Sequence, residues 1–257
     1  MSIISLSGRM RCGKDTVGNI IQYLIAKDNF LKQNHLFNDQ VSTFEEWNNL
    51  VIDKQRFSGW EIKKFAGPLR QVASILLGMN EEFLYTDEFK EMNLSKEWDI
   101  VKQVSENDEN SKDGFALLPM TGREFLQKLG TEAIRNGLHT NAWVNALMSE
   151  YDDNTDNIEA IQLKKSNKKF IITDTRFPNE LQALEEKNAI TIRIVRPCIE
   201  CQGTFSHKMS CSIGFKEHPS ENSLDDARFK YNVYNDGTIP ELVDKIHFIL
   251  QKENIIS

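Results

Sequence analysis

A glycine-bracketed run near the start of the chain, GRMRCGKDT at residues 8–16, has the residue types that bind a polyphosphate. Two glycines let the backbone point its N–H groups at phosphate oxygens, and the following lysine supplies charge to the terminal phosphates. Asp15 stands where a serine or threonine usually contacts magnesium, so either Asp15 through water or the Thr16 hydroxyl would serve that ion. We expect the run to hold a polyphosphate through Gly8, Arg11, Cys12, Gly13, Lys14, Asp15 and Thr16. A glycine-rich turn with an unrelated lysine is the alternative.

A second polar cluster, Asp174-Thr175-Arg176, directly follows the apolar segment at residues 170–173. In phosphate-loop enzymes, a carboxylate at the carboxyl end of a buried strand holds magnesium or a water of its shell. The planar fork of Arg176 suits an acceptor phosphate. A structural salt bridge between Asp174 and an arginine is the other interpretation.

Further arginines stand where predicted strands and helices begin or end, namely Arg70, Arg123, Arg135 and Arg196. Phosphoryl transfer needs positive charge over both substrates. Taken alone, each arginine is more often an ordinary surface residue than a ligand. Trp143 suits either stacking on a base or a core position.

A third cluster combines cysteines and a histidine in the spacing Cys198-x2-Cys201-x5-His207-x3-Cys211. These are the ligand types of a tetrahedral zinc site. Four protein ligands leave no open coordination position, so zinc there would brace the segment and take no part in catalysis. Free thiols in an irregular segment are the alternative.

The composition of the 257 residues, 40% hydrophobic and 27% charged, is that of a folded globular protein. The net charge of −7 disfavours binding to nucleic acid or to an anionic membrane, so phosphate must be held by local cations and backbone N–H groups. We see neither a signal peptide nor an apolar run long enough for a membrane span, and we expect a cytoplasmic protein. The assembly, including a homodimer, stays open.

The elements that must position these residues alternate along the chain. Strands are expected at residues 3–6, 60–65, 170–173, 191–195 and 231–234. Helices are expected at residues 15–26, 69–77, 179–187 and 240–252, and over 121–151 with a break at Asn136-Gly137. Residues 28–58 show poor periodicity, and the charged stretch at 80–113 suits exposed helix and loop. The alternation predicts an α/β fold, a parallel sheet flanked by helices, with ligands beyond the carboxyl ends of the strands.

Almost end to end, the chain resembles the deoxynucleoside monophosphate kinase family of T-even-like bacteriophages, a family of P-loop kinases. The matching stretches are LSGRMRCGKDT (6–16), FAGPLR (65–70), FLQKLGTEAIRNGLHTNAWV (125–144), TDTRFPNELQAL (173–184), IRIVRP (192–197) and NDGTIPELVDKI (235–246). The 125–144 block and the DTR stretch are the specific parts, because a phosphate loop alone is shared by many NTPases.

The resemblance implies a P-loop NTPase-like fold in one domain over residues 1–257, with acceptor-side insertions at 28–58 and 80–150 and a lid at 197–219. It implies transfer of the γ-phosphoryl group from Mg-ATP to a deoxynucleoside monophosphate bound between the helices of 121–150 and the strand end at Asp174. The implied acceptor residues are Arg9, Met10, Arg70, Arg123, Gln127, Gly130, Thr131, Trp143, Asp174 and Arg176. Asn235 would lie near the adenine, and catalysis would rest on Lys14, Asp174, Arg176 and Arg196. A phage protein would act in the host cytoplasm.

Other functions stay open on the sequence. A small-metabolite kinase such as a phosphomevalonate kinase uses a similar GKD loop. A binding protein that ATP regulates without turnover, or a zinc-containing nucleic-acid module, belongs to a different class. The acidic charge disfavours the nucleic-acid module.

Overall fold

The computed structural model describes residues 3–32, 43–50, 53–103, 114–152, 168–197 and 222–257. The chain divides into two compact units, one of Met1–Lys64 with Ser149–Ser257 and the other of Phe65–Met148. Most of the insertion predicted at residues 80–150 falls in the second unit. Among the described residues, no helix combines the length and the apolar character that a membrane crossing requires.

The first unit is built on a five-stranded sheet in the order β2-β5-β1-β6-β7, with every neighbouring pair parallel. The strands are β1 (Ile3–Ser7), β2 (Glu61–Lys63), β5 (Phe170–Thr175), β6 (Ile190–Val195) and β7 (Tyr231–Tyr234). The central strand β1 is buried along its whole length, as expected for a parallel sheet covered on both faces. The predicted parallel α/β fold is confirmed.

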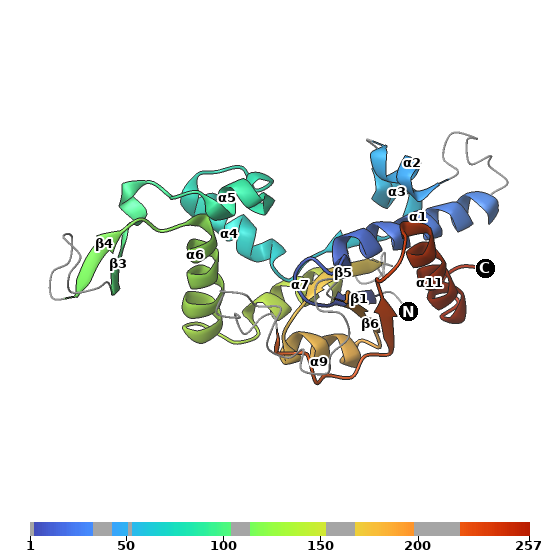
Figure 1. Cartoon of the computed structure of the whole chain (residues 1–257). Helices are drawn as coiled ribbons and strands as arrows, with labels where there is room; N and C mark the ends of the chain where they lie inside the picture. The colour runs from blue at the N-terminus through green and yellow to red at the C-terminus, as the bar shows by residue number, and fades with distance from the viewer. Residues whose placement is uncertain (1–2, 33–42, 51–52, 104–113, 153–167, 198–221) are drawn as a thin grey trace, which may run out of the picture. The chain divides into compact units, whose positions relative to one another are not determined.

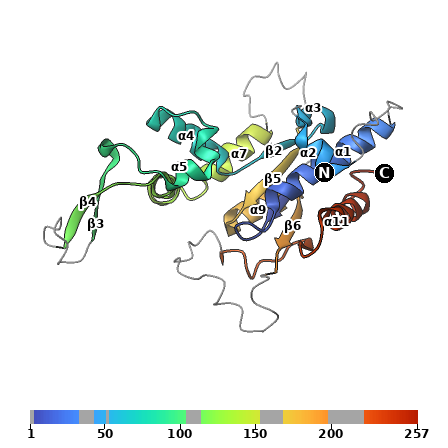
Figure 2. The same cartoon turned by 45° about the horizontal axis from the view of Figure 1, so that its top comes forward.

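Helices cover both faces of this sheet. Figure 1 shows α1 (Lys14–Lys32) along one side and α9 (Pro178–Glu186) along the other. The connection through α1 leads from β1 to β2, and the connection through α9 leads from β5 to β6, which is the opposite direction across the sheet. Because such connections are right-handed, the two helices lie on opposite faces. The C-terminal helix α11 (Ile239–Lys252) packs beside α1 (Figures 1 and 2). All of the predicted helices of this unit are present.

Two short helices, α2 (Phe44–Asn49) and α3 (Lys54–Ser58), fall in the stretch where the sequence showed poor periodicity. An aromatic cluster holds them to α1. For α2, the ring of Tyr23 lies 5.9 Å from that of Phe44 and 6.1 Å from that of Trp47. For α3, the ring of Phe57 lies 5.6 Å from that of Phe30. Their stability therefore depends on contacts with a distant part of the chain, which local periodicity does not report.

The second unit has a hydrophobic core of its own, made by Ala73, Leu84, Phe89, Leu94, Met120 and Phe125. Its helical elements are α4 (Gly67–Leu77), η1 (Phe83–Tyr85), α5 (Asp87–Glu91), η2 (Lys96–Trp98), α6 (Gly122–Gln127), the π-helix η3 (Lys128–Asn136) and the start of α7 (Ala142–Asp152). Thr121 and Glu124 form a capping box that begins α6. The predicted break in the helices near Asn136-Gly137 is confirmed by the gap between η3 and α7.

A β-hairpin of β3 (Ile100–Gln103) and β4 (Phe115–Leu118) lies in the same unit. The prediction of helix and loop over residues 80–113 is wrong for β3. Alternating burial explains the strand, because Ile100 packs against the core of the unit while Val101 is exposed. The charges around this segment conceal that alternation in the sequence.

Candidate active site

The phosphate-loop segment runs from the end of β1 into the first turn of α1, beyond the carboxyl end of the strand. Gly8 and Gly13 have φ angles of 151° and 100°, which residues with a side chain rarely adopt. A Cβ on Gly8 would lie 2.5 Å from the carbonyl oxygen of Ile194, and a Cβ on Gly13 would lie 2.6 Å from Nδ2 of Asn235. Both glycines are therefore required by backbone conformation and by close packing.

Lys14, the first residue of α1, folds back over the loop. Its Nζ donates to the carbonyl oxygens of Gly8 and Arg9, each at 2.8 Å, and the residue is 8% exposed. The ammonium group and the N-terminus of α1 thus concentrate positive charge at the loop. Together with the loop N–H groups, this arrangement suits a polyphosphate.

Asp15 follows Lys14 and lies next to the end of β5. Its Oδ1 accepts hydrogen bonds from Nζ of Lys64 at 2.9 Å and from Oγ1 of Thr173 at 3.0 Å. Burial raises the pKa of Asp15, but the hydrogen bond and the charge of Lys64 outweigh it, so the pKa lies below its ordinary value. The carboxylate is therefore ionised at neutral pH.

Asp15 and Thr16 are the oxygen donors that this end of the loop offers to a cation. In the described part of the chain, no group of three or more His, Cys, Asp or Glu residues converges on a metal position. Magnesium is commonly held by one or two protein ligands together with the phosphates of the substrate. The residues present therefore fit magnesium that arrives with a nucleotide.

Asp174 and Arg176 lie at the carboxyl end of β5, and both side chains are half-buried. The backbone N–H groups of Arg176 and Phe177 donate to Oε2 of Glu180 at 2.8 Å and 3.1 Å. Glu180 is buried in the first turn of α9 and holds the turn between strand and helix. The strand was predicted to end at Thr173, but β5 continues to Thr175, so Asp174 lies within the last residues of the strand and Arg176 directly follows it. The chemical role of the pair stays a prediction.

Asn235 connects the loop to the last two strands of the sheet. Its backbone N–H donates to the carbonyl of Val195 at 2.8 Å, and its Nδ2 donates to the carbonyl of Cys12 at 2.9 Å. Cys12 is a buried free thiol. Asn235 therefore supports the loop directly, while its predicted position near the adenine stays a prediction.

Arg196 follows β6 and is exposed. The proposed zinc ligands Cys198, Cys201, His207 and Cys211 lie outside the described residues.

Asp225 makes a contact with the loop that the sequence did not indicate. Its carboxylate bridges Arg9 and Arg193, with each oxygen 2.7 Å from one guanidinium nitrogen. Asp225 belongs to no motif, and its partners are distant in the sequence, so only the folded chain reveals the contact. Met10, the neighbour of Arg9, is 59% exposed.

In the second unit, the candidate arginines have partners near them. Arg70 donates to the carbonyls of Leu84 at 3.4 Å and Ala66 at 3.3 Å, and its guanidinium lies 4.2 Å from the ring centroid of Tyr85. Arg123, on α6, pairs with Glu91 at the surface. Gln127, Thr131 and Arg135 lie on α6 and η3, Gln127 being exposed and the other two half-buried.

Trp143 is 7% exposed, and its indole N–H donates to the carbonyl of Gly130 at 3.0 Å. Gly130 packs closely as well, because a Cβ there would lie 2.9 Å from Cδ2 of Leu69. Gly130 belongs to the π-helix η3, a rare form of helix that occurs frequently at functional sites. The indole therefore has a structural partner in the core of the unit, and stacking on a base stays a prediction.

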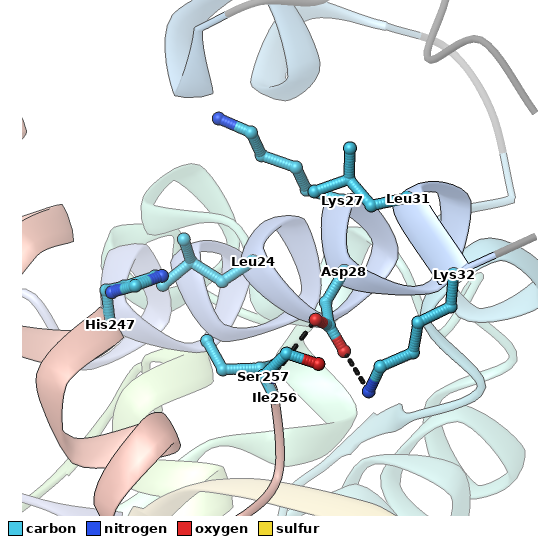
Figure 3. Close-up of a pocket in the computed structure, with 8 residues that line it drawn as sticks. All are labelled: Leu24, Lys27, Asp28, Leu31, Lys32, His247, Ile256 and Ser257. Atoms are coloured by element: carbon cyan, nitrogen blue, oxygen red, sulfur yellow. Dashed lines mark hydrogen bonds and ion pairs between the residues drawn. The ribbon is translucent and has the colours of Figure 1, made fainter. Parts of the chain in front are cut away.

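A pocket of about 340 Å³ lies at the far end of α1 from the loop, against the C-terminus of the chain (Figure 3). Its lining residues are Leu24, Lys27, Asp28, Leu31, Lys32, His247, Ile256 and Ser257. Asp28 is engaged by Nζ of Lys32 at 2.6 Å and by the backbone N–H of Ser257 at 3.0 Å. The contact with Ser257 fastens that residue to α1, and no loop residue lines the pocket.

Comparison with known proteins yields a match to a family model described as deoxynucleotide monophosphate kinase, over residues 2–246. The deoxynucleoside-5'-monophosphate kinase of Escherichia phage T5 is 25% identical over 193 residues, which cover 62% of this chain and 70% of the phage protein. The deoxynucleotide monophosphate kinase of Enterobacteria phage T4 is 24% identical over 263 residues, covering 96% and 97%. A putative deoxynucleotide monophosphate kinase of Acanthamoeba polyphaga mimivirus is 24% identical over 196 residues, covering 73% and 81%.

Proposed function

This chain belongs to the deoxynucleotide monophosphate kinase family, and from that premise we propose that it takes the γ-phosphoryl group of ATP at residues 8–16. The protein is an enzyme that phosphorylates a deoxynucleoside monophosphate. The observation that carries the ATP assignment is Lys14, buried against the carbonyls of a loop whose glycines admit no side chain.

The donor side of the reaction depends on the loop. Lys14, held over the loop by the carbonyls of Gly8 and Arg9, would contact the β and γ oxygens of ATP through its ammonium group. The loop N–H groups and the N-terminus of α1 would hold the remaining phosphate oxygens. Asp15 and Thr16 would hold magnesium, which neutralises charge on the β and γ oxygens when it is bound.

On the acceptor side, an oxygen of the nucleotide α-phosphate would attack the γ phosphorus in line. The bond from that phosphorus to the bridging oxygen of ADP breaks, and ADP leaves with the electron pair. The acceptor oxygen is already an anion, so no side chain has to remove a proton. Positioning and charge neutralisation are therefore what the protein must supply, and we assign these roles to Arg123 and Arg176 on the acceptor phosphate.

Other roles also belong to this proposal. We assign Arg196 to the migrating phosphoryl group, Asp174 to the shell of magnesium and Asn235 to the adenine side of the loop. Zinc at the Cys and His cluster, a homodimer and a cytoplasmic location stay predictions from the sequence.

The test is ADP release from Mg-ATP with each deoxynucleoside monophosphate, each ribonucleoside monophosphate and mevalonate 5-phosphate supplied separately. We expect turnover with one or more deoxynucleotides, its loss on chelation of magnesium, and its loss in Lys14→Met. Turnover with mevalonate 5-phosphate alone, or unchanged turnover in Lys14→Met, would contradict the proposal.

A further inference from the structure

Asp225 lies between two arginines, one from the phosphate loop and one from β6. Its Oδ2 is 2.7 Å from Nη2 of Arg9, and its Oδ1 is 2.7 Å from Nη2 of Arg193. Arg193 also donates from Nη1 to Oγ of Ser7 at 2.9 Å, and Ser7 immediately precedes the loop. One carboxylate thus joins the start of the loop to strand β6.

The contact with Asp225 constrains a residue on which the loop depends. The carbonyl oxygen of Arg9 accepts from Nζ of Lys14 at 2.8 Å and from the backbone N–H of Cys12 at 3.3 Å. Movement of Arg9 would therefore displace the groups that align Lys14. A loop that must be ordered when the polyphosphate arrives binds it more weakly than a loop that is already ordered.

Asp225 is well placed to restrain Arg9, because its own segment is anchored independently of the loop. Leu224 is 3% exposed, and the guanidinium of Arg193 lies 5.6 Å from the ring centroid of Phe229. Backbone hydrogen bonds from Asp225 to Asn222 and from Ala227 to Leu224 tighten the turn between them. The carboxylate thus stands on a packed segment.

We propose that Asp225 is a positioning residue for ATP binding, which holds Arg9 and, through its carbonyl, the ammonium group of Lys14 in the receptive conformation. This inference rests on the proposed function of the loop. Both oxygens of Asp225 are engaged by arginines, so it acts through Arg9 and not by touching the nucleotide.

The test compares Asp225→Asn with Asp226→Asn. The first replaces one acceptor oxygen by an amide that cannot serve two guanidinium groups. The second makes the same charge change one residue further on, at an exposed side chain with no hydrogen bond or ion pair in the described part of the chain. The readouts are the dissociation constant of a non-hydrolysable Mg-ATP analogue by calorimetry, and KM and kcat for ATP with an accepted deoxynucleotide.

We expect Asp225→Asn to raise the dissociation constant of the analogue and the KM for ATP about tenfold, and to change kcat and the KM of the deoxynucleotide less than about twofold. Asp226→Asn should match the wild type. In an Arg9→Met background, Asp225→Asn should add little, because its effect passes through Arg9. Equal affinity for the analogue in all single variants, or additive effects in the double variant, would overturn the inference.

Two further measurements keep the outcomes apart. If Asp225→Asn is unfolded at the assay temperature, Asp225→Glu carries the same comparison, because it keeps the charge and displaces the carboxylate by one methylene group from its position between the two guanidinium groups. If the wild type releases no ADP with any deoxynucleotide, the proposed function fails. Binding of the ATP analogue to the same variants still decides whether Asp225 positions the loop.

Discussion

The phosphate loop and the helical second unit carry the two halves of the predicted chemistry. Different kinds of contact hold the candidate residues of each region in place. In the loop, Lys14 and Asn235 contact backbone carbonyls within one contiguous run. In the second unit, Arg123 and Trp143 are far apart in sequence and contact Glu91 and Gly130. A loop substitution should therefore lower the catalytic rate and leave the fold intact. In the second unit, substitution of an exposed residue should change substrate binding, and substitution of a buried residue should change stability.

The largest effect is expected for Lys14→Met, the sharpest test of the loop half of this contrast. We expect kcat to fall by about a hundredfold to a thousandfold, because a positioned charge on the migrating phosphoryl group is lost. The unfolding midpoint should stay close to the wild type, since the side-chain hydrogen bonds described for Lys14 are to the loop itself. Single-turnover kinetics and urea unfolding measure the two quantities.

The control for Lys14→Met is Lys128→Met, which removes a lysine from an i,i+4 surface pair with Glu132. That variant should keep its kcat. If both variants lose activity equally, the loss reflects net charge and the loop has no special role.

The loop was predictable because its information is local. An apolar strand, two glycines and a lysine stand within one short stretch, and the same holds for the apolar strands that make the parallel sheet. The family resemblance, read from such stretches, is confirmed by the match over residues 2–246. Local patterns thus suffice for the class of fold and for the position of the glycine-bracketed loop between β1 and α1.

What the sequence did not indicate depends on pairing between distant residues. Strand β5 extends to Thr175 because that residue pairs with Ser7 on β1, beyond the end of the apolar run. The bridge from Asp225 to Arg9 likewise joins residues that no local pattern connects.

An intermediate effect is expected for Arg123→Met, which tests the exposed part of the second unit. If Arg123 binds the acceptor phosphate, the KM for the deoxynucleotide should rise about tenfold to a hundredfold, because a charge-assisted hydrogen bond is lost. The KM for ATP should not change. Stability should change little, since surface ion pairs contribute little.

The matched variant Glu91→Gln removes the partner of Arg123 and leaves the arginine in place. It should bind the deoxynucleotide as the wild type does. Equal KM values in Arg123→Met and Glu91→Gln would mean that the ion pair matters and that the arginine does not contact substrate.

The smallest effect is expected for Trp143→Phe, which tests the buried part of the same unit. The change leaves the carbonyl of Gly130 without its indole donor, so the free energy of unfolding should fall by about 1–2 kcal/mol. Trp98→Phe is the control, because Trp98 packs edge-on against Phe125 in the same unit and its indole makes no hydrogen bond in the described residues. Urea unfolding of both variants isolates the hydrogen bond from the loss of ring area.

Phenylalanine keeps an aromatic face, so the KM for the deoxynucleotide should stay near the wild type in Trp143→Phe. A raised KM with unchanged stability would instead assign the indole to the base of the substrate.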